Sequence, residues 1–263
     1  MFVKAALFTS LCLATSCQIA VAQESPPQTD CDKYAASDVD ENRKATGITI
    51  DKVDPKLAIP ACLEALRHYP QSARFFYQLA RGYMQNKDYK AAQEFIQKAS
   101  DAGYVAAWNA FGYMYLNGFG FPKDDGKALE WFRKAAEQNN LGAITSIAMM
   151  YLKGRGVAKD EQQAVVWLRK AADRGYPTAQ ANLGILYFTG RGVAKDNTQA
   201  FALYQKSANS GYAVGQFLLG LMYENGYGVA ADKSQAIVWY RRSAAQGETR
   251  AQNRLDVIEK NTK

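Results

Sequence analysis

The sequence has few of the residue types from which catalytic and metal sites are built. Its 263 residues include one histidine, His68, and four cysteines. His68 and two cysteines as far apart as Cys31 and Cys62 do not make the ligand set of a zinc site. No S-x-x-K motif occurs, and the glycine-rich segments lack the G-K-[ST] ending of a phosphate-binding loop. We therefore predict no catalytic residue, no metal site and no cofactor.

No apolar run in the sequence is long enough to cross a membrane. The longest candidate, residues 5–14, follows Lys4 and precedes the small residues of positions 20–22. This layout is typical of a cleavable export signal. We predict a signal peptide over residues 1–22, cleaved near Ala22, and a periplasmic or secreted protein without a transmembrane segment. An uncleaved anchor and lipidation at Cys17, with Ala14 at the start of the cleavage motif, remain alternatives.

Removal of such a leader leaves two cysteines, Cys31 and Cys62, and a net charge of about +6 from 31 basic and 25 acidic residues. An even number of cysteines in an exported chain favours a disulfide. A Cys31–Cys62 bond would close a loop of about 30 residues and contribute about 3 kcal/mol. Two buried free thiols are the alternative.

Four copies of a 36-residue unit fill most of the chain, without insertion or deletion. The same residue recurs at three marker positions: Tyr115, Tyr151, Tyr187 and Tyr223; Gly118, Gly154, Gly190 and Gly226; Asp124, Asp160, Asp196 and Asp232. A period of this length indicates stacked supersecondary units that bury a continuous core only when neighbours pack together. The sequence thus predicts an all-α fold, a right-handed α-solenoid of stacked antiparallel helix pairs.

The segments before and after these copies have helical patterns of their own. We predict a lead-in over residues 23–54 with a short helix at 31–37, and tetratricopeptide-like helices over 55–104. Four repeats follow over 105–248, and a capping helix over 249–263. Pro55 is placed to start a helix that ends at His68, whose imidazole we assign to the surface or the helix C-terminus.

Each repeated residue of the unit has a physical role. The loop aspartates precede the second helix and are predicted N-caps, which we prefer to a carboxylate or calcium ladder. Glycines 175, 211 and 247, and Asn139 in the first unit, are expected to end each unit in the left-handed conformation. Trp131, Trp167 and Trp239 are predicted to anchor the second helices in the core.

The pattern A-x-x-x-L-G-x-x-Y-x-x-G-x-G-V-x-x-D-x-x-x-A-x-x-W-x-x-K-A-A is nearly complete over residues 179–208 and 215–244. It resembles the Sel1-like repeat, a longer relative of the tetratricopeptide repeat, and the cysteine-bearing front end is similar to that of exported bacterial members. The resemblance implies a non-catalytic protein-interaction scaffold in the bacterial cell envelope. Some cysteine-rich relatives are linked to penicillin binding and weak β-lactamase activity, so a cell-wall-related or β-lactamase-like hydrolase is the alternative.

Stacking of the tetratricopeptide type would place the first helix of each unit on the concave face. The positions expected there are Tyr77, Arg81, Asn109, Tyr113, Thr145, Met149, Ala181, Ile185, Phe217, Leu221 and Asn253. We predict that this stripe binds a partner protein or peptide. The alternative is that these side chains pack against one another in a tightly wound solenoid. The repeated tyrosines and tryptophans are assigned to the core, so no nucleic-acid partner is expected.

The loops form a second candidate surface. Five basic residues lie on them: Lys153, Arg155, Lys159, Arg191 and Lys195. Such a ridge could make weak electrostatic contact with an anionic envelope polymer. A solvated basic edge without a partner is the alternative.

Overall fold

The computed structural model describes residues 26–37 and 50–260, and every element in these ranges is helical. The predicted signal peptide lies outside the described residues. The elements are α1 (Asp30–Ala35), η1 (Ile50–Lys52), α2 (Pro55–His68), α3 (Ala73–Gln85), α4 (Tyr89–Asp101), α5 (Val105–Asn117), α6 (Asp125–Glu137), α7 (Leu141–Lys153), α8 (Glu161–Ala172), α9 (Pro177–Thr189), α10 (Asn197–Asn209), α11 (Ala213–Asn225), α12 (Lys233–Ala244) and α13 (Thr249–Lys260).

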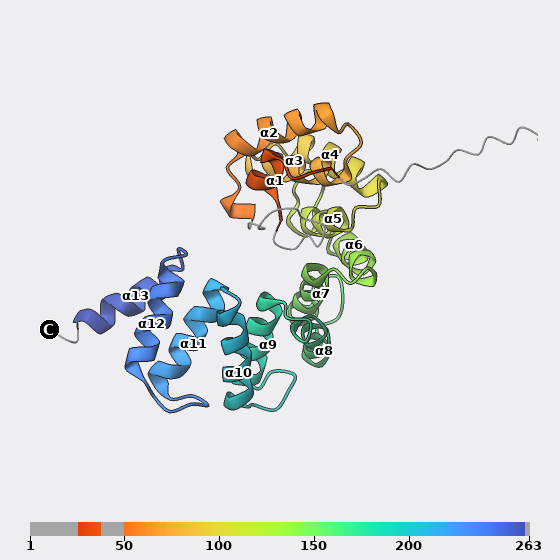
Figure 1. Cartoon of the computed structure of the whole chain (residues 1–263). Coiled ribbons are helices and arrows are strands. Elements are labelled where there is room, and N and C mark those ends of the chain that lie inside the picture. Colours follow the sequence, from red (N-terminus) through yellow and green to blue (C-terminus); the bar gives the residue numbers. More distant parts are fainter. Residues whose placement is uncertain (1–25, 38–49, 261–263) are drawn as a thin grey trace, which may run out of the picture.

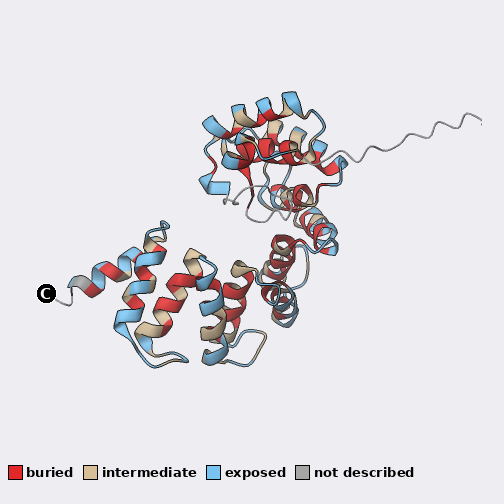
Figure 2. Ribbon diagram, viewed as in Figure 1, coloured by how far each residue is buried: buried red, intermediate tan, exposed pale blue. Residues whose placement is uncertain are grey.

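Consecutive helices pack in pairs, and each pair packs on the next. The pairs α3/α4, α5/α6, α7/α8, α9/α10 and α11/α12 follow one another in a curved row, with α1 and α2 at one end and α13 at the other (Figure 1). Buried residues lie mainly on the sides of helices that face a neighbouring helix (Figure 2). The predicted all-α solenoid is confirmed. None of the described helices is both long and apolar enough to cross a membrane.

The helix ends follow the sequence prediction closely. Each loop aspartate caps a second helix: Asp160 Oδ1, for example, accepts the Gln163 amide at 2.9 Å, and Asp196 Oδ1 accepts the amides of Thr198 and Gln199. Gly175, Gly211 and Gly247 have φ angles of 81°, 83° and 91°, and Asn139 has a φ of 61°. These left-handed residues turn the chain from one unit into the next.

The deepest core position differs from the predicted one. The tryptophans are half-buried, and a basic side chain lies over each ring, as Lys170 does over Trp167 at 5.6 Å. The next residue along each second helix is fully buried instead: Phe132, Leu168, Tyr204 and Tyr240. A residue of the first helix with a small side chain faces this position within the same unit. Gly112, Gly184 and Gly220 lie against the three rings.

A disulfide between Cys31 and Cys62 joins α1 to α2, as predicted. Both cysteines are fully buried in a cluster with Phe75 and Leu79 of α3. Beside them, the Asp32 carboxylate pairs with the Arg74 guanidinium at 3.0 Å, and both side chains are buried. The short helix α1 is therefore fixed on the solenoid by a covalent bond and an ion pair rather than by its own length.

Candidate functional site

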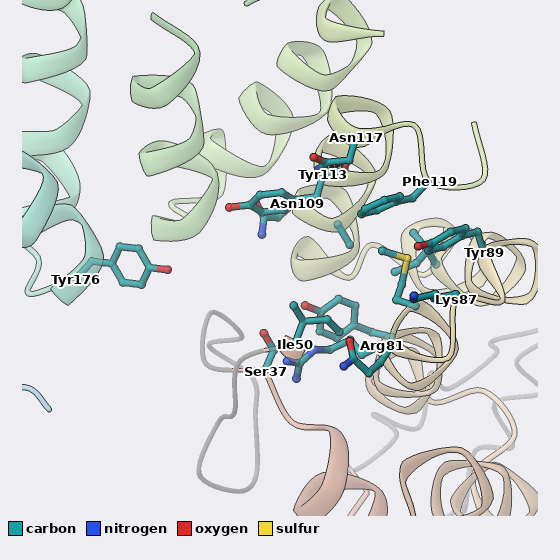
Figure 3. Close-up of a pocket in the computed structure, with 15 residues that line it drawn as sticks. Ser37, Ile50, Arg81, Lys87, Tyr89, Asn109, Tyr113, Asn117, Phe119 and Tyr176 are labelled. Carbon is teal, nitrogen blue, oxygen red and sulfur yellow. Dashed lines mark hydrogen bonds between the residues drawn. The ribbon is translucent and has the colours of Figure 1, made fainter. Parts of the chain in front are cut away.

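A cavity of about 590 Å³ lies near the N-terminal end of the solenoid, where α3, α4 and α5 face Ser37 and η1 (Figure 3). Tyr176, just before α9, points toward it from the other side. The lining residues are Ser37, Ile50, Tyr77, Arg81, Met84, Gln85, Lys87, Tyr89, Ile96, Asn109, Ala110, Tyr113, Asn117, Phe119 and Tyr176. A mainly apolar lining with a few polar groups, at this size, is typical of a ligand site.

The cavity brings together four of the predicted concave-face residues, Tyr77, Arg81, Asn109 and Tyr113. The Tyr77 ring packs at a tilt on Tyr104, 5.5 Å between centroids. Arg81 Nη1 donates to the backbone oxygen of Ala35 at 2.7 Å, which holds this buried guanidinium in place.

Tyr113 is the most exposed of these four side chains, with 43% of its surface accessible. Its ring meets Phe132 edge to face at 5.3 Å, and its hydroxyl accepts a hydrogen bond from Ser146 Oγ at 3.0 Å. Both contacts hold the ring in position before any ligand arrives, which limits the entropy lost on binding.

Asn109 is the polar residue of the lining whose hydrogen bonding is incomplete. Its side chain is 97% buried, as only 3% of its surface is accessible. Within the described part of the chain, its Oδ1 atom has no hydrogen-bond partner. A buried polar atom without a partner costs free energy. Because this atom is closed off from solvent, a ligand in the cavity does not reach it.

The remaining predicted positions do not line this cavity. Thr145 is buried, and its hydroxyl donates to the Leu141 carbonyl at 2.8 Å. Phe217 is buried against Tyr240, with the Arg250 guanidinium over its ring. Three others, Met149, Ile185 and Leu221, are half-buried, and Ala181 is buried and Asn253 exposed. Along the stripe the structure thus combines a cavity at one end with close packing further on.

Sequence reasoning missed several lining residues. Tyr176 comes from a unit turn two pairs away, and Ser37 and Ile50 come from the lead-in. No local pattern marks these three: the curvature of the array brings Tyr176 to the cavity, and the packing of α1 and η1 on α3 brings Ser37 and Ile50. Tyr89 and Phe119 were recognisable as a contacting pair, because they occupy the repeat positions that Asp125 and Arg155 occupy 36 residues later.

The basic loop ridge is partly engaged in ion pairs between units. Arg155 contacts both carboxylate oxygens of Asp125, at 3.0 and 2.6 Å, and the Leu116 carbonyl. Arg191 Nε and Nη2 both donate to Glu161 Oε1, at 2.9 and 2.7 Å. The Arg155 hydrogen bond holds the pKa of Asp125 below its usual value. These two arginines therefore serve the junctions between units. Lys159 Nζ also pairs with Glu161 at 3.2 Å, so three of the five cations of the predicted ridge are engaged in ion pairs.

Equivalent pairs recur at 30-residue spacing along the array. The first is an aromatic stack of Tyr89 and Phe119, with centroids 4.8 Å apart. The second glycine of each loop comes close to the first residue of the preceding unit's second helix. A Cβ on Gly156 would lie 2.4 Å from the Asp125 carbonyl oxygen, so only glycine fits there.

The described residues hold no cluster of three or more histidines, cysteines, aspartates and glutamates that could bind a metal ion. The buried phenols carry shifted pKa values for structural reasons. Burial raises the pKa of Tyr204, and burial together with the hydrogen bond to Glu224 raises that of Tyr240. Both phenols stay neutral at physiological pH, as core residues should.

An array of stacked helix pairs with glycine-rich inter-helix loops defines the class of α-solenoid repeat proteins. Within that class, the model of the Sel1 repeat matches residues 73–104, 105–140, 138–176, 177–212 and 213–248. The chain belongs to the Sel1 repeat family. The matches also include residues 73–104, which the sequence analysis described as tetratricopeptide-like.

Solved structures of similar proteins agree with this assignment. A Sel1 repeat protein from Oxalobacter formigenes is 36% identical, with a TM-score of 0.60 over 66% of this chain and 71% of that one. The immunity protein Pa5087 from Pseudomonas aeruginosa is 26% identical, with a TM-score of 0.54 over 68% and 67%. A Sel1 repeat protein from Klebsiella pneumoniae, 24% identical with a TM-score of 0.50 over 73% and 96%, shares the fold. Comparison with curated protein sequences gives no match.

Proposed function

We propose that this protein is a non-catalytic interaction scaffold of the bacterial cell envelope that holds a partner protein or peptide in the cavity of its concave face. The observation that carries the proposal is that Tyr77, Arg81, Asn109 and Tyr113 line one cavity of about 590 Å³. Pockets of this size with a mixed lining suit a few side chains of an extended partner segment. The buried Cys31–Cys62 disulfide supports export, because such bonds persist in oxidising compartments.

Site-specific photo-crosslinking in living cells tests the proposal. A benzophenone side chain in place of Tyr113 keeps an aromatic ring at the cavity mouth, and the same side chain in place of Val166, 58% exposed on α8, is the control. We expect a discrete crosslinked protein from position 113 and none from position 166.

The partner must also depend on the concave surface. Glutamates in place of Tyr113 and Met149 should abolish its co-purification, whereas Val166→Glu should retain it. Circular dichroism confirms that each variant is folded. A folded double variant that still captures the partner at the wild-type level would overturn the proposal. Export is tested separately with alkaline phosphatase fused to the C-terminus. This enzyme is active only outside the cytoplasm, so we expect the fusion to be active.

A further inference from the structure

The first and second helices of the four repeats differ in charge. The sequences of α5 and α9 contain no charged residue, and α7 and α11 contain one each, Lys153 and Glu224, in their last turns. Glu224 is already paired with Arg254 and accepts a hydrogen bond from the Tyr240 hydroxyl at 2.6 Å. The four second helices contain thirteen charged residues. The array therefore has a nearly neutral layer of first helices beside a charged layer of second helices.

The neutral layer forms the inner side of the curved row (Figure 1). Neighbouring first helices contact each other directly, α5 with α7 and α9 with α11. Such contacts are expected on the inner side of a curve, where helices lie closest together, and packed helices have axes about 8–10 Å apart. A given repeat position therefore presents one side chain about every 10 Å along this face.

A row of large apolar side chains runs along this face, one from each first helix. Tyr113 is 43% exposed at the cavity, and Met149, Ile185 and Leu221 are half-buried at the equivalent positions. We call these four residues the concave stripe. Large apolar side chains that stay accessible in a row are characteristic of an interaction surface.

The polar side chains beside the stripe bond to their own helices. Asn117, Thr189 and Asn225 each follow a stripe residue by four positions, and each donates to the backbone oxygen of that residue, at 2.8, 2.7 and 2.9 Å. A charged partner residue placed here would lose hydration and find no opposite charge within the stripe. The stripe therefore favours a partner surface that is apolar and uncharged.

The backbone of the partner must then be satisfied without donors from the stripe. An α-helix meets this condition, because its backbone groups bond to one another. Its residues i and i+7 also lie on one face about 10.5 Å apart, which matches the spacing of the stripe. Residues i and i+3 of a strand span about 10 Å as well, but they point to opposite faces. A polyproline II segment has a comparable repeat, but its backbone groups depend on water.

We infer that the concave stripe binds an amphipathic α-helix of the partner, whose apolar residues recur at heptad spacing and whose contacting face carries no charge. The cavity at the end of the stripe takes the extended segment next to this helix. The inference rests on the proposed function and specifies the part of the partner that lies beyond the cavity.

Fluorescence polarisation with three synthetic peptides tests the inference on the purified protein. Each peptide is about 22 residues long, which accommodates four anchors at heptad spacing. The helix probe has leucines at alternating spacings of three and four residues among Gln, Lys and Glu. The strand probe has the same composition with the leucines at every second position, and the charged probe has lysine in place of two central leucines of the helix probe. We expect the helix probe to bind about tenfold more tightly than either of the others.

The variant Ile185→Glu separates recognition from folding. A carboxylate in the middle of the stripe should weaken binding of the helix probe about tenfold and strengthen binding of the charged probe, because the lysines then meet an opposite charge. A misfolded protein would lose both, so this reversal requires an intact groove. Val166→Glu is the matched control: it introduces the same charge at an exposed apolar position on α8, and neither affinity should change.

Three results would overturn the inference. The strand probe could bind as tightly as the helix probe, which would indicate an extended partner. Ile185→Glu could leave both affinities unchanged. The protein could form a dimer that Ile185→Glu dissociates, which would show that a second copy covers the stripe. Each of these results is compatible with a crosslinked partner at position 113, so the proposed function is tested independently.

Discussion

Gly184 of α9 lies directly against the ring of Tyr204 of α10: a Cβ added to Gly184 would be 2.6 Å from Tyr204 Cε1. Gly112 with Phe132 and Gly220 with Tyr240 repeat this relationship. In the second unit, Ala148 faces the smaller Leu168, and both are fully buried. Ring size on one helix and side-chain size on its partner therefore compensate within each unit, so that the two helices keep the same close approach.

The pair predicts a size-dependent effect of substitution. Gly184→Ala should destabilise the protein by about 1–2 kcal/mol, because overpacking against a buried ring outweighs the helix propensity gained from alanine. Adding Tyr204→Leu should recover part of this loss, as the second unit already contains the Ala/Leu combination. Urea denaturation measures both effects. Gly126→Ala, on the exposed first turn of α6, is the control and should not destabilise.

The junction ion pair predicts a pH dependence. Arg155 lowers the pKa of Asp125 in the folded protein, so the pair contributes stability above the unfolded pKa of about 4 and loses it as the pH falls through the folded pKa. Both side chains are about one quarter exposed, which limits the contribution to about 0.5–1 kcal/mol. Arg155→Gln should thus cost more stability at pH 7 than at pH 3, measured by denaturant titration. An equal cost at both values would show that the carboxylate charge is irrelevant.

The Cys31–Cys62 disulfide predicts a local effect of reduction. Replacing both cysteines with alanine should cost about 3 kcal/mol, mostly in α1, α2 and α3, whose buried residues surround the bond. Since units of a solenoid contact only their neighbours, hydrogen exchange should rise in these helices and remain unchanged in α11 and α12. A uniform rise along the whole array would contradict this picture.

The loop aspartates predict capping without metal binding. Asp196→Ala should cost about 1 kcal/mol, because the Thr198 and Gln199 amides lose their acceptor, and Asp196→Asn should retain most of the stability. Thermal melts measure both changes. Addition of millimolar calcium should leave the wild-type Tm where it was; a calcium-dependent rise would favour the carboxylate ladder instead.

Local features of this chain were predictable from the sequence, whereas contacts between units were less so. The Asp54 and Ser72 caps of α2 and α3 follow from residues only a few positions apart. The buried ring of Tyr204 was missed because the position before it holds tryptophan in three of the four units, and that large apolar residue was assigned to the core instead. The signal was nevertheless present, as an aromatic or leucine recurs at this position every 36 residues.

The residues that line the cavity could not all be predicted, because the curvature of the array decides which units approach it. Tyr113 was correctly selected as an exposed residue of a first helix, but the approach of Tyr176 depends on the angle accumulated over the intervening pair α7/α8. The partners of Arg155 and Arg191 depend likewise on how one loop meets the preceding unit. Their 30-residue spacing from Asp125 and Glu161 encodes that contact in the sequence, and it is recognisable once the first pair is known.

Because the junction pairs have a constant spacing, one unit can replace another at a junction. Excision of residues 141–176, one full 36-residue unit, would place Arg191 opposite Asp125 and so exchange one acid–arginine contact for another. Tyr212 would then occupy the chain position of Tyr176. The number of units can therefore change by one without requiring a new type of contact between units. Duplication of a 36-residue unit in the gene would lengthen the concave surface in this way.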